Sequence, residues 1–183
     1  MLLRHLALVR ITHGIHTLTL LALLISGVAI LMAHPRLYWG ETGAFGSPAL
    51  IELPLPLNTD QSGWGRSLHF LTAWIAVVNG TIYASFGLMT NHFRGEKYNA
   101  LQRLAYRAVT FVLFPIMIAT GLAMSPAVGA VLPMIVGIFG GHQSARTIHF
   151  VVMDFLVLFT VAHVVMAGLA GRNRILSMIT GYE

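Results

Sequence analysis

The sequence predicts an all-α integral membrane protein, a bundle of four transmembrane helices forming a single domain over residues 1–183. The chain is 56% hydrophobic and only 9% charged, whereas soluble domains carry roughly a quarter charged residues. Several uncharged runs also reach the length of about 20 residues that spans a bilayer. We expect the four helices at about residues 14–33, 67–90, 106–125 and 147–171.

The first two spans are defined by their lack of charge. Gly14 to Ala33 contains no Asp, Glu, Lys or Arg, and the run ends at His34-Pro35. Ser67 to Thr90 is likewise free of these residues. Each run is long enough to cross the hydrocarbon core once, so each is expected to form one spanning helix.

The boundary between the third and fourth spans is predicted from a proline within one long uncharged run. The uncharged run from Ala108 to Ala145 is too long for one straight helix. Because proline cannot continue the helical hydrogen-bond ladder, Ser125-Pro126 is expected to end the third helix. Ala127 to Phe139 then reads as a short interfacial or re-entrant piece. The fourth span, Thr147 to Gly171, holds one formal charge, Asp154, which could handle protons or bond across helices.

The basic residues predict how the chain is oriented. Net charge is +5, and 8 of the 11 Lys and Arg residues fall at the N-terminus, in the second connection or in the tail. The positive-inside rule then places both termini in the cytoplasm, with the long first connection, Pro35 to Gly65, facing outward. A basic excess of this kind marks cytoplasmic loops, so we do not read it as nucleic-acid binding.

Histidines are unusually frequent for so apolar a chain. The chain has nine histidines and no cysteine. The lack of cysteine excludes disulfides, iron–sulfur clusters and covalently attached c-type haem. Four fall at helix ends or in loops, where solvated side chains are ordinary: His5, His34, His92 and His142. The others fall within the expected spans, where an ionisable group is costly and marks function by default: His13, His16, His69, His149 and His163.

The spacing of these histidines indicates two metal sites at different depths. His149 and His163 are 14 residues apart. At 100° and 1.5 Å per residue, that separation returns within about 40° of the same helix face and covers roughly 21 Å. The expected topology places His69 level with His149, and His13 level with His163, although spacing alone cannot choose between His13 and His16. Two bis-histidine haems stacked across a membrane require this arrangement.

A repeated arginine supports the same interpretation. Haem propionates point toward water and are matched by guanidinium groups. On a helix, residues three apart share a face, so an arginine there lies one turn nearer the membrane surface. Such arginines also serve as plain interfacial anchors, but three instances at expected ligands favour propionate contacts: Arg10 before His13, Arg66 before His69 and Arg146 before His149.

Motifs along nearly the whole chain resemble those of the prokaryotic membrane cytochrome b561 superfamily. Arg10-Ile-Thr-His13, leading to Ser26-Gly27, resembles the R-x-x-H-W start and Ser-Gly pair of its first helix, with Gly14 in place of the Trp. Further matches are the K-Y-N-x-x-Q segment Lys97-Tyr98-Asn99-Ala100-Leu101-Gln102, then Thr120-Gly121, Ile148-His149 with His163, and Met178-Ile179-Thr180-Gly181. The superfamily includes the formate dehydrogenase gamma subunit and the cytochromes b of nickel–iron hydrogenase and thiosulfate reductase.

The resemblance implies a di-haem b-type cytochrome embedded in lipid. It pairs His69 with His149 in an outer haem b and His13 with His163 in an inner one, leaving His16 as the alternative ligand. It also implies a quinone pocket near the inner haem, with Asn99 and Gln102 as contacts. Family members pass electrons between quinone and an outer-face redox partner. The Trp39-Gly40 loop and the cysteine-free composition resemble members that serve periplasmic molybdopterin oxidoreductases.

Three functions compete at this point. The first is a quinone-linked electron-transfer subunit, in which bis-histidine iron has no open coordination site and substrate chemistry belongs to a partner or to the quinone. The second is a stand-alone quinone-linked oxidoreductase of a small molecule such as superoxide, active without a partner. The third is a transporter whose histidines relay protons or bind a metal. The last predicts a colourless protein and leaves the arginine–histidine spacing unexplained.

Overall fold

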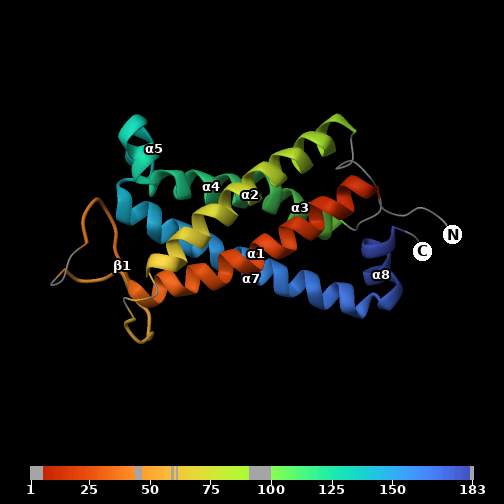
Figure 1. Ribbon diagram of the computed structural model, residues 1–183, viewed down its shortest axis with the longest axis horizontal. Helices are drawn as coiled ribbons and strands as arrows, with labels where there is room; N and C mark the ends of the chain where they lie inside the picture. Colours follow the sequence, from red (N-terminus) through yellow and green to blue (C-terminus); the bar gives the residue numbers. More distant parts are fainter. Residues whose placement is uncertain (1–5, 44–46, 59, 61, 91–99, 182–183) are drawn as a thin grey trace. The chain divides into compact units, whose positions relative to one another are not determined.

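The computed structural model describes the whole chain except residues 1–5, 44–46, 59, 61, 91–99 and 182–183 (Figure 1). Among the described residues, four helical runs are long and apolar enough to cross a membrane: Ala7–Ala33, Gly63–Met89, Ala100–Ala123 and His142–Leu169. The expected fold class, an all-α membrane protein with four spanning helices, is therefore confirmed.

All four spans begin several residues before the expected bounds, and three of them are single α-helices. These three are α1 (Ala7–Ala33), α2 (Ser62–Met89) and α7 (His142–Leu169). The expectation counted only uncharged residues, whereas Arg10, Arg66 and Arg146 each lie within the first turns of a helix. A long arginine side chain reaches the membrane surface from such a position, so the helix continues past it.

The third span is composite. It consists of α3 (Ala100–Ala108), a π-helical turn η3 (Val109–Leu113) and α4 (Phe114–Ala123). The backbone N–H of Phe114 donates to the carbonyl of Val109, five residues earlier. The next residue, Pro115, has no N–H and its ring crowds the preceding turn, so a wider turn just before it relieves this clash.

Two short helices follow the third span. α5 (Pro126–Val131) and α6 (Met134–Ile138) occupy the stretch that was expected to be interfacial or re-entrant. Leu132 leaves the helical region, with φ −131° and ψ 67°, and Pro133 precedes α6. The depth of this stretch in the membrane stays a prediction.

The structure divides into two compact units, which we describe separately. Unit 1 comprises Met1–Gly27, Trp64–Asn99 and Val157–Glu183, and unit 2 comprises Val28–Gly63 and Ala100–Leu156. Unit 1 thus holds most of α1 and α2, the C-terminal part of α7 and the final helix α8 (Arg172–Thr180). That residues 1–183 act as a single di-haem domain stays a prediction.

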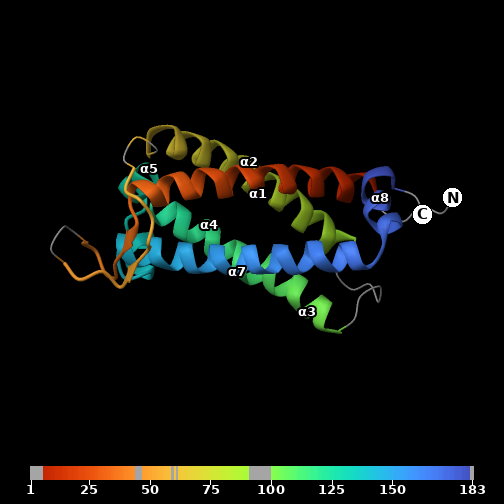
Figure 2. The same ribbon diagram turned by 90° about the horizontal axis from the view of Figure 1, so that it is seen from below.

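In unit 1, polar contacts fix the rotation of α1 and its attachment to α8. The buried Asn79 on α2 donates from Nδ2 to the carbonyl of Thr12, 2.8 Å away. Arg10 donates from Nη2 to the carbonyl of Ile179, and α8 lies beside the first turns of α1 in both views (Figures 1 and 2). These bonds hold the end of α1 that carries His13 and His16.

In unit 2, the first connection caps the N-terminus of α7. The strands β1 (Arg36–Leu37) and β2 (Ile51–Glu52) pair antiparallel. Beyond β1, the Gly40 carbonyl accepts from the N–H groups of Gln143 and Ser144 at 3.0 and 3.2 Å. The Gly40 N–H donates to Ser144 Oγ at 2.7 Å. The helix N-terminus, whose N–H groups lack partners within the helix, is thus satisfied by the loop.

The spans carry large apolar side chains outward and small ones inward. Leu18, Val78 and Leu158 are more than half exposed, whereas Ala29 and Ala123 are buried. Several buried side chains in the spans are hydroxyls: Thr12, Thr19, Ser26, Thr72, Thr120 and Thr147. This distribution of side chains is the reverse of that in a soluble protein. It matches helices that contact lipid on the outside and pack through small residues on the inside.

Candidate functional site

Two of the expected ligands face each other in unit 1. The imidazole of His13 on α1 and that of His163 on α7 have ring centroids 6.2 Å apart, with an angle of 49° between the ring planes. The ring of Phe159, one turn earlier on α7, stacks on His163 at 5.9 Å and 18°. The structure therefore brings together the two histidines that the family resemblance pairs at the inner site.

His16 has a different environment. Its imidazole lies against Gly80 on α2, where a Cβ atom built on the glycine would be 3.5 Å from His16 Cε1 and 3.7 Å from Nε2. The glycine gives the ring space beside α2. Of the two histidines that spacing could not separate, it is His13 whose ring pairs with that of His163.

His69 lies in unit 1 on α2, next to the Ser-Gly pair of α1. Its Nδ1 is 3.0 Å from Ser26 Oγ, and a Cβ built on Gly27 would be 3.8 Å from His69 Cε1. The contacts with Ser26 and Gly27 thus hold the His69 ring at a defined position against α1.

His149 has an equivalent environment in unit 2, where α4 runs beside the first part of α7 (Figure 2). Its Nδ1 is 2.9 Å from Thr120 Oγ1, and a Cβ built on Gly121 would be 3.5 Å from its Cε1. Sequence reasoning noted both dipeptides as family motifs but did not find that their hydroxyls contact histidine rings. The sequence feature that could have predicted these contacts is a hydroxyl residue directly before a glycine within an apolar span.

The three arginines have different partners. Besides its bond to Ile179, Arg10 has a buried Nε with no hydrogen-bond partner among the described residues. Arg146 donates from Nη2 to the carbonyl of His34, just after the end of α1. Arg66 is exposed near the start of α2. The contacts of all three with propionates stay a prediction.

The expected quinone contacts are only partly described. Asn99 lies outside the described residues, and Gln102 is half-buried on α3. Asp154 is exposed on α7, and Asn79 has the packing contact with Thr12 described above. The quinone assignment therefore stays a prediction.

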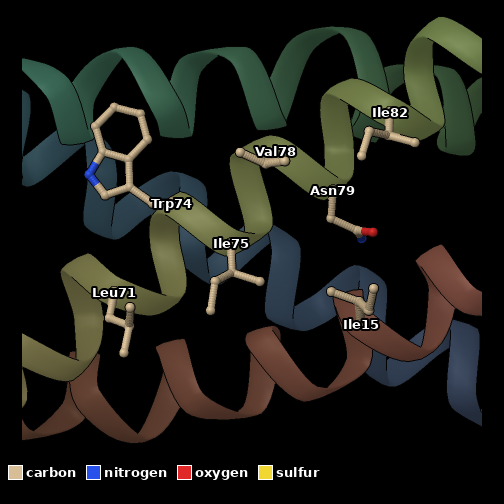
Figure 3. Close-up of a pocket in the computed structure, with 7 residues that line it drawn as sticks. All are labelled: Ile15, Leu71, Trp74, Ile75, Val78, Asn79 and Ile82. Carbon is tan, nitrogen blue, oxygen red and sulfur yellow. The ribbon is translucent and has the colours of Figure 1, made fainter.

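An apolar groove in unit 1 lies outside the histidine sites. It has a volume of about 380 Å³, and Figure 3 shows its lining on α1 and α2: Ile15, Leu71, Trp74, Ile75, Val78, Asn79 and Ile82. Its one polar side chain, Asn79, already donates to Thr12. None of the five span histidines lines it, so the groove is not part of the candidate site.

The fold and these side chains define a polytopic membrane protein with histidines fixed on its spanning helices. Residues 4–181 match the family of prokaryotic cytochrome b561, and the chain belongs to that family. It is therefore a membrane protein that binds haem b and transfers electrons, as the resemblance predicted.

The chain is also similar to a protein of Azospira oryzae, YedZ1, which is provisionally named as a subunit of a protein-methionine-sulfoxide reductase. The two are 27% identical over 94% of this chain and 93% of the relative. No solved structure gives a significant match.

The geometry in unit 1 fits a haem iron. Because a metal–imidazole bond is about 2.0 Å long and a ring nitrogen lies about 1.1 Å from the ring centre, two imidazoles sharing one iron have centres roughly 6 Å apart. The 6.2 Å between His13 and His163 agrees with this. The unpartnered Arg10 Nε, one turn before His13, suits an anionic propionate. Across the described residues, no group of three or more His, Asp or Glu side chains converges as a closed metal site would need.

Proposed function

We propose that this chain is a di-haem b-type cytochrome that carries electrons across the bacterial inner membrane between quinone and an outer-face redox protein. The observation that carries the proposal is the His13–His163 pair, whose ring separation suits one shared iron. In this proposal His13 and His163 bind the inner haem, and His69 and His149 bind the outer one. The outer pairing rests on residue spacing and on the family motifs.

The chain supplies ligands, charge and an apolar environment. When bound, each haem supplies a one-electron carrier. Because two imidazoles would hold each iron, it would have no position open to a small substrate, and these sites would suit electron transfer. Arg10, Arg66 and Arg146 would neutralise propionates near the membrane surfaces, and the apolar spans keep water from the ligands.

The two ends of the electron path are proposed from the family and the relative. Asn99 and Gln102 would contact quinone on the cytoplasmic side, which the basic residues assign to both termini. On the outer side, the partner would be an oxidoreductase, and the relative's name suggests one that reduces methionine sulfoxide in proteins. A periplasmic molybdopterin oxidoreductase, the class expected from the sequence, would exchange electrons at the same face.

The test is an absorption spectrum of the purified chain, air-oxidised and then dithionite-reduced, with haem counted per polypeptide. We expect a sharp b-type α band and two haems per chain, and reduction of both by a short-chain quinol. One haem per chain would remove one ligand pair from the proposal. A colourless protein after expression with ample haem would overturn it. Rapid superoxide turnover by the isolated chain would favour the stand-alone oxidoreductase.

A further inference from the structure

Two buried hydroxyls in the spans differ from the others in what they contact. Ser26 Oγ and Thr120 Oγ1 each lie within hydrogen-bond distance of a histidine Nδ1 on another helix, at 3.0 Å from His69 and 2.9 Å from His149. The hydroxyls of Thr12, Thr19 and Thr72 bond to carbonyls of their own helix, and that of Thr147 bonds to the Tyr38 carbonyl. The same relationship thus occurs once in each unit.

The direction of these hydrogen bonds follows from counting hydrogens. A hydroxyl has one hydrogen to donate and two lone pairs. Ser26 donates to the carbonyl of Ala22 at 2.7 Å, and Thr120 donates to that of Ile116 at 2.8 Å. Each hydroxyl is therefore left as an acceptor toward the imidazole. The Nδ1 atoms of His69 and His149 then carry the hydrogen, and in neutral imidazole the lone pair lies on Nε2.

The following glycine packs against the same edge of each ring. Cβ atoms built on Gly27 and Gly121 would lie 3.8 and 3.5 Å from Cε1 of His69 and His149. The hydroxyl and the glycine together therefore hold the Nδ1–Cε1 edge in both cases. One dipeptide is Ser-Gly and the other Thr-Gly, so the feature they share is a hydroxyl followed by glycine.

We propose that Ser26 and Thr120 are positioning residues that fix the tautomer and ring orientation of His69 and His149, presenting Nε2 to the outer haem. The proposal rests on the proposed function. An acceptor on the far nitrogen of a metal-bound imidazole raises the basicity of the ligand. A more basic ligand stabilises ferric iron, so the two hydroxyls lower the reduction potential of the haem that these histidines hold.

The test compares Ser26→Ala and Thr120→Val with the parent chain, by redox titration of the α band and by low-spin EPR. Each variant removes an acceptor with little change in shape. We expect both haems to stay bound, one of them to show a higher potential and a shifted EPR signal, and the other to be unchanged. Ser26→Thr and Thr120→Ser restore a hydroxyl and should restore the parent values. Thr19→Ala, which removes a buried hydroxyl bonded only to its own helix in the described contacts, is the matched control.

The outcomes separate this inference from the proposed function. Unchanged potentials and EPR signals in both variants, or an equal shift in Thr19→Ala, would overturn the positioning role. Loss of one haem in Thr120→Val but not in Thr120→Ser would support it. If the two variants shift different haems, the hydroxyls still position ligands but the pairing of His69 with His149 is wrong. A parent chain without haem would refute the proposed function itself.

Discussion

The imidazole rings of His13 and His163 face each other with centroids 6.2 Å apart, although 150 residues separate them in the sequence. His13 comes from α1 and His163 from the C-terminal part of α7, both within unit 1. His16, one turn further along α1, lies beside Gly80 on α2. The rotation of α1 therefore decides which of its two histidines meets α7.

Replacing these histidines in turn tests the ligand assignment. We expect His13→Ala to reduce the haem content from two per chain to one, because an imidazole facing His163 is lost. His16→Ala should keep both haems. The measurement is haem per polypeptide, from the pyridine haemochrome spectrum and a protein assay. The opposite pattern, with haem lost only in His16→Ala, would show that the ring pair in unit 1 is not the ligand pair.

Arg10 is expected to anchor the C-terminal helix. Its guanidinium bonds to the Ile179 carbonyl, and a Cβ atom on Gly181 would lie 2.6 Å from Arg10 Nη1. Losing a hydrogen bond of this kind costs about 1 kcal/mol, so Arg10→Gln should speed tryptic cleavage after Arg172 about fivefold if cleavage follows local opening.

The control for that experiment is Arg36→Gln. Arg36 pairs with Glu52 at 2.9 Å in unit 2, so its loss should leave cleavage of the tail unchanged. Equal cleavage rates in the parent and in Arg10→Gln would contradict an anchoring role for Arg10.

The amide of Asn79 should contribute measurably to stability. Asn79→Leu keeps the approximate shape but removes the donor to the Thr12 carbonyl. Hydrogen bonds between membrane helices are worth about 0.6 kcal/mol on average and up to about 1.7, so the free energy of unfolding in SDS should fall by an amount in that range. Thr81→Ala is the control, because Thr81 is exposed and bonds to Val77 on its own helix. An equal effect of both substitutions would count against a specific contribution from Asn79.

Gly141 should tolerate no side chain. Its φ is +119°, and a Cβ atom there would lie 2.4 Å from the Gly40 carbonyl oxygen, which caps α7. A strained backbone of this kind costs about 1–3 kcal/mol, and the capping loop would also have to move. Gly141→Ala should therefore lower the melting temperature in detergent and the yield of folded protein.

Gly137→Ala provides the comparison in the same unit. A Cβ atom on Gly137 in α6 meets nothing within 4 Å, so this variant should melt like the parent. If Gly141→Ala also melts like the parent, the contact between residues 40 and 141 is not important for stability.

The class of protein, the four spans and the set of candidate ligands could all be predicted from the order of the amino acids. These features depend on local properties, because hydropathy over about 20 residues identifies a span and an ionisable side chain inside one is conspicuous. Membership of the cytochrome b561 family follows from motifs that the sequence also displays. The helix starts were less well predicted, since arginine at a helix end was counted as outside the span.

Which side chains meet could not be predicted and is seen in the folded chain. Helical periodicity places His13 and His16 on nearby faces, but the rotation of α1 depends on contacts such as Asn79 with Thr12, which come from distant parts of the chain. The bonds of Ser26 and Thr120 to histidine rings and the capping of α7 by Gly40 are equally long-range. Such contacts are set by how helices pack against one another, and spacing along a single helix does not contain that information.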